Sequence, residues 1–223
     1  LSISGDGSQA TFATLDPASA SDSNGVVDCY MRSTTGGGSV FPVSTSSAGS
    51  YGDNTCDEAV LNFDGTRVAF VSTASNLGQT TDVNGLFGED VFLKATDGGQ
   101  PGLTTFISES VATPGNTGNF ASSEVDIDAS GQLIVFSTQA TDLFTPDGNA
   151  RADVVLYDTT TGTLVPLSIF AGSTLGDGDS GSPKIASHGL FVAFESEATN
   201  LVTPDTNGSK DVLVVDLDTG TLR

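Results

Sequence analysis

The sequence predicts an all-β fold built from four repeats, on the strength of three observations. A phenylalanine that closes a short apolar run recurs after 58, 66 and 58 residues, and a glycine stands five residues before each one. No stretch keeps a helical period, because Gly, Ser, Thr, Asp and Asn interrupt the longer runs. Units this small cannot bury their own apolar faces, so they must stack on one another. The repeat-defining residues are Gly7 and Phe12, Gly65 and Phe70, Gly131 and Phe136, and Gly189 and Phe194.

The fourth repeat shows the order of the elements, in which short apolar or β-branched strands alternate with turns and one polar loop. These elements are an extended segment (184–187), the turn His188-Gly189, an apolar strand (190–194), a polar loop from Asp205 to Asp211, a β-branched strand (212–215) and a turn (218–220). The third repeat adds a strand over 164–170, which makes four strands per repeat.

The inner strands are near-continuous apolar runs, as in 68–71 and 133–136, which is typical of a sheet covered on both faces. The blades of a β-propeller are covered in this way. We therefore predict a single β-propeller domain of four blades over 1–223. Thr221 aligns with Thr163, so the chain stops as a fourth strand begins, and the last blade is expected to lack that strand. The predicted blades are 1–58, 59–124, 125–182 and 183–223.

The repeat resembles that of the TolB-like β-propellers over the whole chain. Residues 62–72 (NFDGTRVAFVS) resemble the strand pair of that repeat, and 205–212 (DTNGSKDV) resemble its loop and following strand. The first copy departs most, with Cys29 in place of the valine, and the third has Ala150 in place of the loop glycine. The resemblance implies a fold and not an activity, because propellers support many unrelated functions.

Composition narrows the function classes. The chain has 28 acidic and 7 basic residues and a formal charge of −21, so it lacks the clustered Lys and Arg that nucleic acids and anionic membranes require. No apolar run approaches the roughly 20 residues of a membrane span, so no membrane insertion is expected. Abundant Ser, Thr and Gly with few lysines favour an extracellular or cell-surface location, with the periplasm as the alternative.

The ends of the sequence suggest a processed product or a fragment, since it starts at Leu1. The open edge of the last blade allows three outcomes. The gene continues past Arg223, a neighbouring copy supplies the missing strand, or the edge is short and solvated. The second outcome is a head-to-tail contact that could build a filament, so the chain itself is one expected partner and another protein is the alternative.

The two cysteines lie in neighbouring repeats. Cys29 starts the third strand of the first repeat, and Cys56 comes just before the first strand of the second. Contact between adjacent blades would allow Cys29 and Cys56 to form a disulfide, while two buried free thiols are the alternative.

A loop with aspartate and asparagine at matching positions recurs in all four repeats. Oxygen side chains at alternate positions around a glycine turn suit calcium, which takes six to eight oxygen ligands, although the full EF-hand pattern is absent. The alternative is a plain loop in which Asp and Asn bind their own backbone. The candidate metal ligands are Asp22, Asn24 and Asp28, then Asp82, Asn84 and Asp90, then Asp147, Asn149 and Asp153, and finally Asp205, Asn207 and Asp211.

No catalytic residue is predicted. The segment 178–183 imitates the nucleophile region of chymotrypsin-like proteases, but Ser180 and the lone histidine, His188, both occupy slots that the repeat fills elsewhere with other residues. The polar residues recur at matching positions instead of forming one singular cluster. The sequence therefore favours a non-enzymatic extracellular module with a structural or interaction role, stabilised by calcium. The alternatives are a hydrolase with its active site in the propeller channel and a TolB-like periplasmic docking protein.

Overall fold

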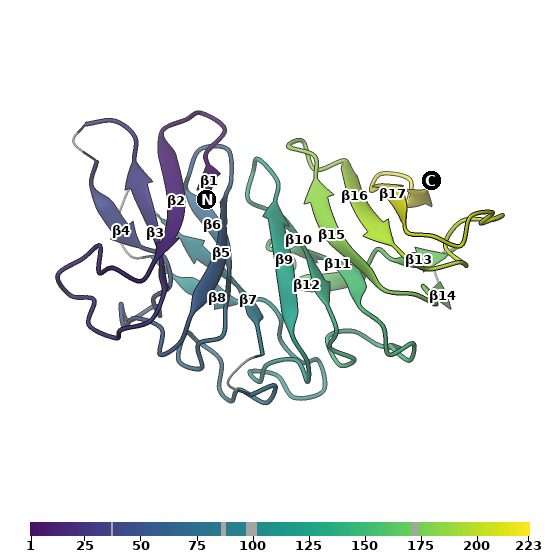
Figure 1. Ribbon diagram of the computed structural model, residues 1–223, viewed down its shortest axis with the longest axis horizontal. Helices are drawn as coiled ribbons and strands as arrows, with labels where there is room; N and C mark the ends of the chain where they lie inside the picture. Colours follow the sequence, from purple (N-terminus) through teal and green to yellow (C-terminus); the bar gives the residue numbers. More distant parts are fainter. Residues whose placement is uncertain (37, 86–87, 97–101, 171–173) are drawn as a thin grey trace.

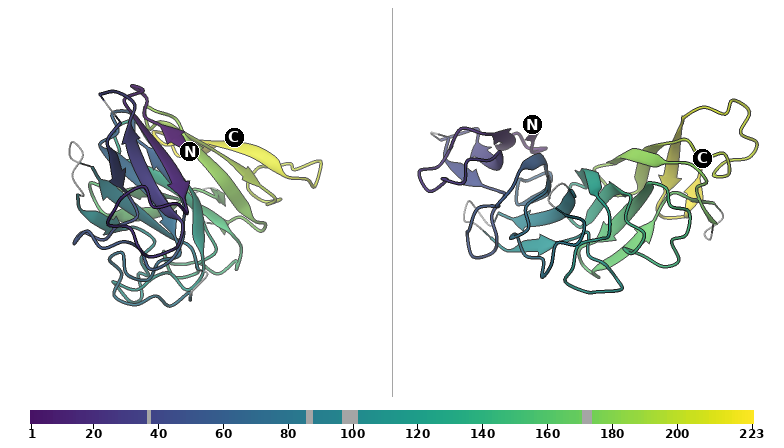
Figure 2. Two further views of the ribbon diagram at one scale, coloured as in Figure 1. Left: turned by 60° about the vertical axis from the view of Figure 1, so that its left-hand side comes forward. Right: turned by 60° about the horizontal axis from the view of Figure 1, so that its bottom comes forward.

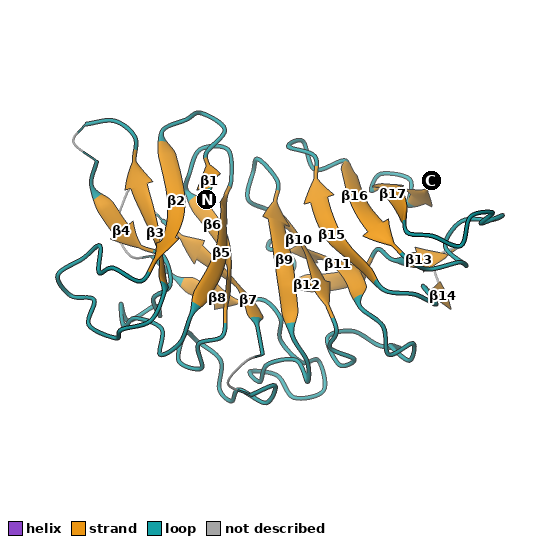
Figure 3. Ribbon diagram, viewed as in Figure 1, coloured by secondary structure: helices purple, strands orange, loops and turns teal. Residues whose placement is uncertain are grey.

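The computed structural model describes residues 1–36, 38–85, 88–96, 102–170 and 174–223. Strands arranged as four four-stranded antiparallel sheets and one two-stranded hairpin make up the regular structure (Figures 1 and 3). In each large sheet the strands lie in the order in which they follow along the chain. The described ranges contain no helix long and apolar enough to cross a membrane.

The four large sheets are called blades 1 to 4. Blade 1 contains β1 (Ser2–Ile3), β2 (Gln9–Thr14), β3 (Asp28–Ser33) and β4 (Val40–Pro42). Blade 2 contains β5 (Cys56–Leu61), β6 (Arg67–Ser72), β7 (Asp90–Ala95) and β8 (Thr104–Phe106). Blade 3 contains β9 (Ser122–Ile127), β10 (Leu133–Thr138), β11 (Asp153–Asp158) and β12 (Thr163–Pro166), and is followed by the hairpin of β13 (Ile169–Phe170) and β14 (Thr174–Leu175). Blade 4 contains β15 (Ser180–Ile185), β16 (Phe191–Ser196), β17 (Asp211–Asp216) and β18 (Thr221–Leu222).

The repeat-defining glycines form the turn between the first two strands of each blade. All four have φ between 68° and 74°, a left-handed conformation that residues with a side chain adopt only at a cost. The first strands of blades 2 to 4 begin at Cys56, Ser122 and Ser180, three residues before the blade boundaries expected at 59, 125 and 183. A register shift at the start of these strands accommodates the additional residues.

Two strand predictions need correction. The last blade does not lack its fourth strand, because β18 pairs with β17, and Arg223 and Val214 exchange backbone hydrogen bonds of 3.0 and 2.9 Å. The strand expected over 164–170 is divided into β12 and β13. The division falls at Leu167 and Ser168, whose N–H groups both turn to the Val154 carbonyl.

The blades follow one another in an arc, with blade 1 and blade 4 at opposite ends (Figures 1 and 2). An apolar cluster fills each space between consecutive blades. Met31 and Phe70 pack between blades 1 and 2, Val91 and Phe136 between blades 2 and 3, and Val135 and Phe194 between blades 3 and 4. This stacking explains the near-continuous apolar strands, since β6 and β10 are covered on both faces.

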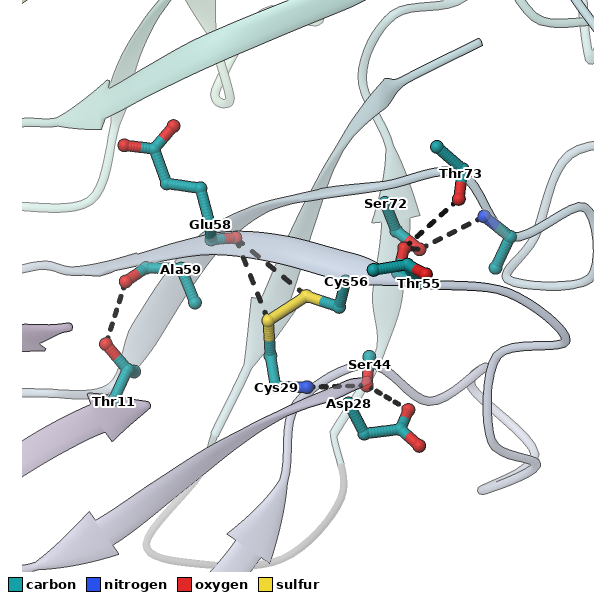
Figure 4. Close-up of a disulfide and its surroundings, with 11 residues drawn as sticks. Thr11, Asp28, Cys29, Ser44, Thr55, Cys56, Glu58, Ala59, Ser72 and Thr73 are labelled. Atoms are coloured by element: carbon teal, nitrogen blue, oxygen red, sulfur yellow. Dashed lines mark hydrogen bonds between the residues drawn. A yellow bond between two sulfur atoms is a disulfide. The ribbon is translucent and has the colours of Figure 1, made fainter. Parts of the chain in front are cut away.

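The predicted disulfide is confirmed. Cys29 of β3 and Cys56 of β5 are joined with a Cα–Cα distance of 5.6 Å, and both residues are fully buried (Figure 4). The bond therefore connects blade 1 to blade 2. It also indicates an oxidising compartment outside the cytoplasm, where disulfides form and persist.

Candidate functional site

The closing aspartate of each predicted metal loop is the first residue of the third strand of its blade. In blades 1 to 3 this carboxylate is buried and accepts a hydrogen bond from a serine hydroxyl that follows the outer strand. The same serine Oγ accepts the N–H of the residue after the aspartate. The Oγ-to-carboxylate distances are 2.6 Å for Ser44 to Asp28, 2.8 Å for Ser108 to Asp90 and 2.6 Å for Ser168 to Asp153.

The asparagine of each loop binds the closing aspartate. Asn149 Nδ2 donates to Asp153 Oδ2 at 3.3 Å and to the Gly176 carbonyl at 3.0 Å, in the segment that leads into blade 4. Asn24 makes the same pair of contacts with Asp28 and Gly52, and Asn84 makes them at longer distances with Asp90 and Phe120. In blade 4, Asn207 donates to Asp211 at 3.1 Å and to no second acceptor among the described residues. Three of the four loops are thus tied to the segment that leads into the next blade.

The opening aspartates differ from loop to loop. Asp22 accepts a short hydrogen bond from the Tyr30 hydroxyl, whereas Asp82 accepts the Gly85 N–H at 3.0 Å. Asp205 accepts the N–H groups of Asn207 and Gly208 at 3.0 and 3.1 Å, as in the plain-turn alternative. Asp147 Oδ1 is buried and has no hydrogen-bond partner among the described residues.

The buried closing carboxylates have unusual acidity. Burial raises the pKa of Asp90 to about 7, against the opposing effects of the Ser108 and Asn84 hydrogen bonds, and the charge of Asp82 raises it further. Burial likewise raises the pKa of Asp153 to about 6 and also raises that of Asp28. These carboxyls resist ionisation because they lie inside the protein.

The arrangement does not gather a metal-binding set. Across the described ranges, no three His, Cys, Asp or Glu side chains are grouped so that they could hold a metal ion. The loop asparagines direct nitrogen toward the closing aspartate, and the Oδ1 atoms of Asn24 and Asn149 accept N–H groups of their own loops. Residues 86–87 of the second loop lie outside the described residues. The loops therefore act first as hydrogen-bonded connections between blades.

We expect Asn149→Ala to lower the free energy of unfolding by about 1–2 kcal/mol, because the Asp153 carboxylate and the Gly176 carbonyl each lose a donor. Chemical denaturation would measure the change. Asn207→Ala is the matched control, since Asn207 makes no hydrogen bond beyond its own loop among the described residues, and it should cost less than about 0.5 kcal/mol. Equal losses in the two variants would contradict the assigned role.

The segment 178–183, which imitates a protease nucleophile region, has a structural role. Ser180 is buried at the start of β15, where its Oγ lies 2.9 Å from Ser196 Oγ, and Ser122 and Thr138 form the equivalent pair in blade 3. His188 lies in the turn beyond the other end of β15, about 20 Å away at the rise of a strand. The serine therefore has no histidine base within reach.

Carboxylates that the sequence did not single out lie on the first strands and bind the next blade. Glu58 Oε2 accepts the Val125 N–H at 3.1 Å, and Glu124 Oε2 accepts the Ser182 N–H at 2.6 Å. Burial raises the pKa of Glu58. A depression of about 270 Å³ between blades 3 and 4 is lined by Glu124 together with Glu195, which pairs with Lys210 at 3.1 Å.

A larger groove of about 790 Å³ lies between blades 2 and 3 and is mostly apolar, with Phe106, Leu143 and Leu164 on its walls. Its ionisable side chains are Glu109 and Tyr157. Burial, together with the charges of Glu109 and Asp158, raises the pKa of the Tyr157 hydroxyl. Glu109 accepts a short hydrogen bond from the Gly115 N–H.

Comparison with solved structures shows which known folds this architecture resembles. The putative TolB from Agrobacterium tumefaciens superposes with a TM-score of 0.60 at 14% identity, over 100% of this chain and 59% of that one. The chain has a TolB-like β-propeller fold. TolB from Acinetobacter baumannii gives a TM-score of 0.54 at 14% identity, over 99% of this chain and 41% of that one. The tricorn protease gives 0.56 at 9% identity, over 96% of this chain and 17% of that one.

The chain thus spans less than two thirds of the length of the TolB structures it matches. No protein-family profile and no curated protein sequence matches it. The resemblance to TolB-like repeats is confirmed for the fold, and identities this low do not carry an activity with them.

Proposed function

We propose that this chain is a non-enzymatic structural and interaction module that acts at the cell surface or outside the cell. The observation that supports it is the use of polar side chains between blades. In blades 1 to 3 the loop asparagines bind the segment that leads into the next blade, and Glu58 and Glu124 bind backbone N–H groups of the next blade. The closing aspartates of these blades fix the loops by binding a serine of their own blade. A general acid or base needs a carboxyl free to exchange protons with a substrate.

Turnover assays test the non-enzymatic assignment. The purified chain should not hydrolyse peptide, ester or glycoside substrates above the buffer rate. Turnover that Glu124→Gln or Glu195→Gln removes, while the variant stays folded, would overturn the assignment and favour a hydrolase that uses the depression between blades 3 and 4.

A TolB-like periplasmic docking module is the second candidate, and the shared fold favours it. The disulfide is compatible with the periplasm as well as with the cell exterior. Saturable one-to-one binding of a purified periplasmic protein would support this candidate over a purely structural role.

Calcium binding stays a prediction. Two buried loop oxygens, Asn84 Oδ1 and Asp147 Oδ1, have no hydrogen-bond donor among the described residues, which makes the second and third loops the places where a cation would act. We expect millimolar calcium to raise the Tm above its value in chelator, because binding to the folded state stabilises it by mass action. Asp147→Asn should reduce the shift. Coincident melting curves for the native chain would contradict the prediction.

A further inference from the structure

The space between blades 1 and 2 holds a buried lysine. Lys94 of β7 is 1% exposed, and its ammonium group lies among oxygen acceptors. Lys94 Nζ donates to the Thr45 carbonyl at 2.8 Å and to Thr45 Oγ1 at 2.9 Å. It also donates to the Ser46 carbonyl at 3.3 Å and to Thr104 Oγ1 at 2.8 Å. Thr45 and Ser46 follow β4, so acceptors of blade 1 bind a cation that belongs to blade 2.

The space between blades 2 and 3 has no such cation. The strand registers, and the serines that bind the closing aspartates, match four positions in the two spaces. The matched pairs, each given as the residue between blades 1 and 2 and then the residue between blades 2 and 3, are Lys94 and Tyr157, Thr104 and Leu164, Thr45 and Glu109, and Ser46 and Ser110. The second space therefore has a tyrosine in place of the lysine and a carboxylate in place of the threonine.

The groove of about 790 Å³ lies at this matched place. Its lining includes Glu109, Ser110, Tyr157 and Leu164, which are the four counterparts of the lysine site. Between blades 1 and 2 the lysine fills the space, and Thr45 is fully buried. Between blades 2 and 3 the space is open, since Glu109 is exposed and Tyr157 is only half-buried. The groove is therefore an unfilled version of the lysine site.

The groove carries negative charge and no positive charge. Glu109 Oε1 accepts the Gly115 N–H, whereas Glu109 Oε2 accepts no hydrogen bond in the described part of the chain. None of the seven basic residues of the chain lines the groove. Burial, followed by the charges of Glu109 and Asp158, raises the pKa of the Tyr157 hydroxyl, as expected where negative charge is not neutralised. A cation that enters the groove would meet an unpaired carboxylate.

Apolar side chains make up most of the remaining wall. Leu143 and Phe144 are buried, while Phe106 and Leu164 are half-buried. Val111 extends the apolar surface toward solvent and is 51% exposed. A lysine packs its aliphatic stem on such a surface while its ammonium reaches a polar group. The groove is also larger than one ammonium group requires, so it has room for an apolar side chain next to the lysine.

We propose that this groove binds a lysine-containing segment of a partner protein, with the lysine ammonium against the Glu109 carboxylate and a neighbouring apolar side chain against Phe106 and Leu164. The partner's lysine takes the place that Lys94 fills between blades 1 and 2. The formal charge of −21 attracts a basic partner and repels a second copy of this chain, which is why a basic protein is the occupant. This deepens the proposed interaction function and rests on it.

An NMR titration of the full chain with two synthetic peptides tests the proposal. The probes are acetyl-Ala-Phe-Lys-Phe-Ala-amide and the same peptide with norleucine, which has no charge, in place of lysine. The lysine peptide should bind roughly three- to tenfold more tightly, as expected for a carboxylate–ammonium contact at a partly exposed site. Its chemical-shift changes should centre on Tyr157 and Leu164. Added salt should reduce the preference, because it screens the charge contact.

Three variants show whether the preference comes from this site. Glu109→Gln should abolish the preference for the lysine peptide. Glu197→Gln is the matched control, because it removes the same charge from an exposed position on blade 4 and should keep the preference. Tyr157→Lys places an internal lysine at the position equivalent to Lys94, so it should weaken binding of the lysine peptide by at least the same factor. Melting curves verify that every variant is folded, and Glu109→Gln decides the outcome if Tyr157→Lys is not.

Several results would overturn the proposal. These are a lysine peptide that does not bind, equal affinities for the two peptides, shift changes away from the groove, a preference that survives Glu109→Gln, and a control that loses it. Concentration-dependent dimerisation that the lysine peptide reverses would instead assign the groove to a second copy. The turnover assays use the chain without peptide, so this proposal can fail while the non-enzymatic assignment stands.

Discussion

Replacing Cys29 and Cys56 together with alanine should lower the free energy of unfolding by about 3–4 kcal/mol. The bond joins residues 27 apart, and closing a loop of that length restricts the unfolded chain by roughly this amount. Both residues are fully buried between blades 1 and 2, so loss of packing adds to the effect. Denaturant titration would measure the loss.

Reduction of the native chain separates the covalent effect from the packing effect. The native chain in reductant keeps both sulfur atoms, so it should lose most of the same free energy, whereas the alanine variant should not respond to reductant. An alanine variant as stable as the oxidised native chain would contradict a stabilising role for the bond.

Asp90→Asn should become more stabilising, relative to the native chain, as pH rises from 5 to 8. Burial raises the pKa of Asp90 to about 7 in the folded protein, from 3.8 in an exposed carboxyl. The folded state therefore holds this proton more tightly than the unfolded state. The resulting stabilisation is fully present below pH 3.8 and is lost as pH rises through about 7. Asparagine has the shape of aspartate but does not ionise, so the variant does not lose this stability as pH rises. At pH 8 its free energy of unfolding should exceed that of the native chain by up to a few kcal/mol.

The measurement is a series of melts in chelator across that pH range. Asp211→Asn is the matched control, because Asp211 occupies the same slot but lies half-buried in blade 4. It reports the general effect of removing one negative charge from a strongly acidic chain. The stability difference between Asp90→Asn and the native chain could stay constant with pH, or change with pH just as the difference for Asp211→Asn does. Either result would disprove the buried-acid interpretation.

Most of the fold could be predicted from short patterns of neighbouring residues. The turn glycines, the apolar runs and the recurring aspartates are adjacent in sequence to the structure they specify, so the four blades could be predicted from them. The serines that bind the closing aspartates also recur in the sequence. Ser44, Ser108 and Ser168 lie 15 to 18 positions after their aspartates, and each directly follows an aliphatic residue. That recurrence pointed to a fixed structural partner.

Contacts between blades could not be predicted in the same way. Glu58 binds the Val125 N–H from a strand whose pairing shifts register next to Glu58, and such shifts leave no reliable sequence pattern. Lys94 is buried among carbonyl and hydroxyl acceptors of blade 1, and no pattern around it in the sequence indicates this. The division between β12 and β13 likewise depends on Ser168, whose partner Asp153 lies on another strand. In each case the deciding partner is distant in sequence.

The arc also sets the way in which this protein comes apart. Because the described blades pack against the blades before and after them, stability behaves as a sum over neighbouring pairs, and a destabilising substitution in blade 2 or 3 weakens two pairs at once. Blades 1 and 2 are also joined by a covalent bond. This pair of blades should therefore be the last of the described pairs to separate when the protein unfolds.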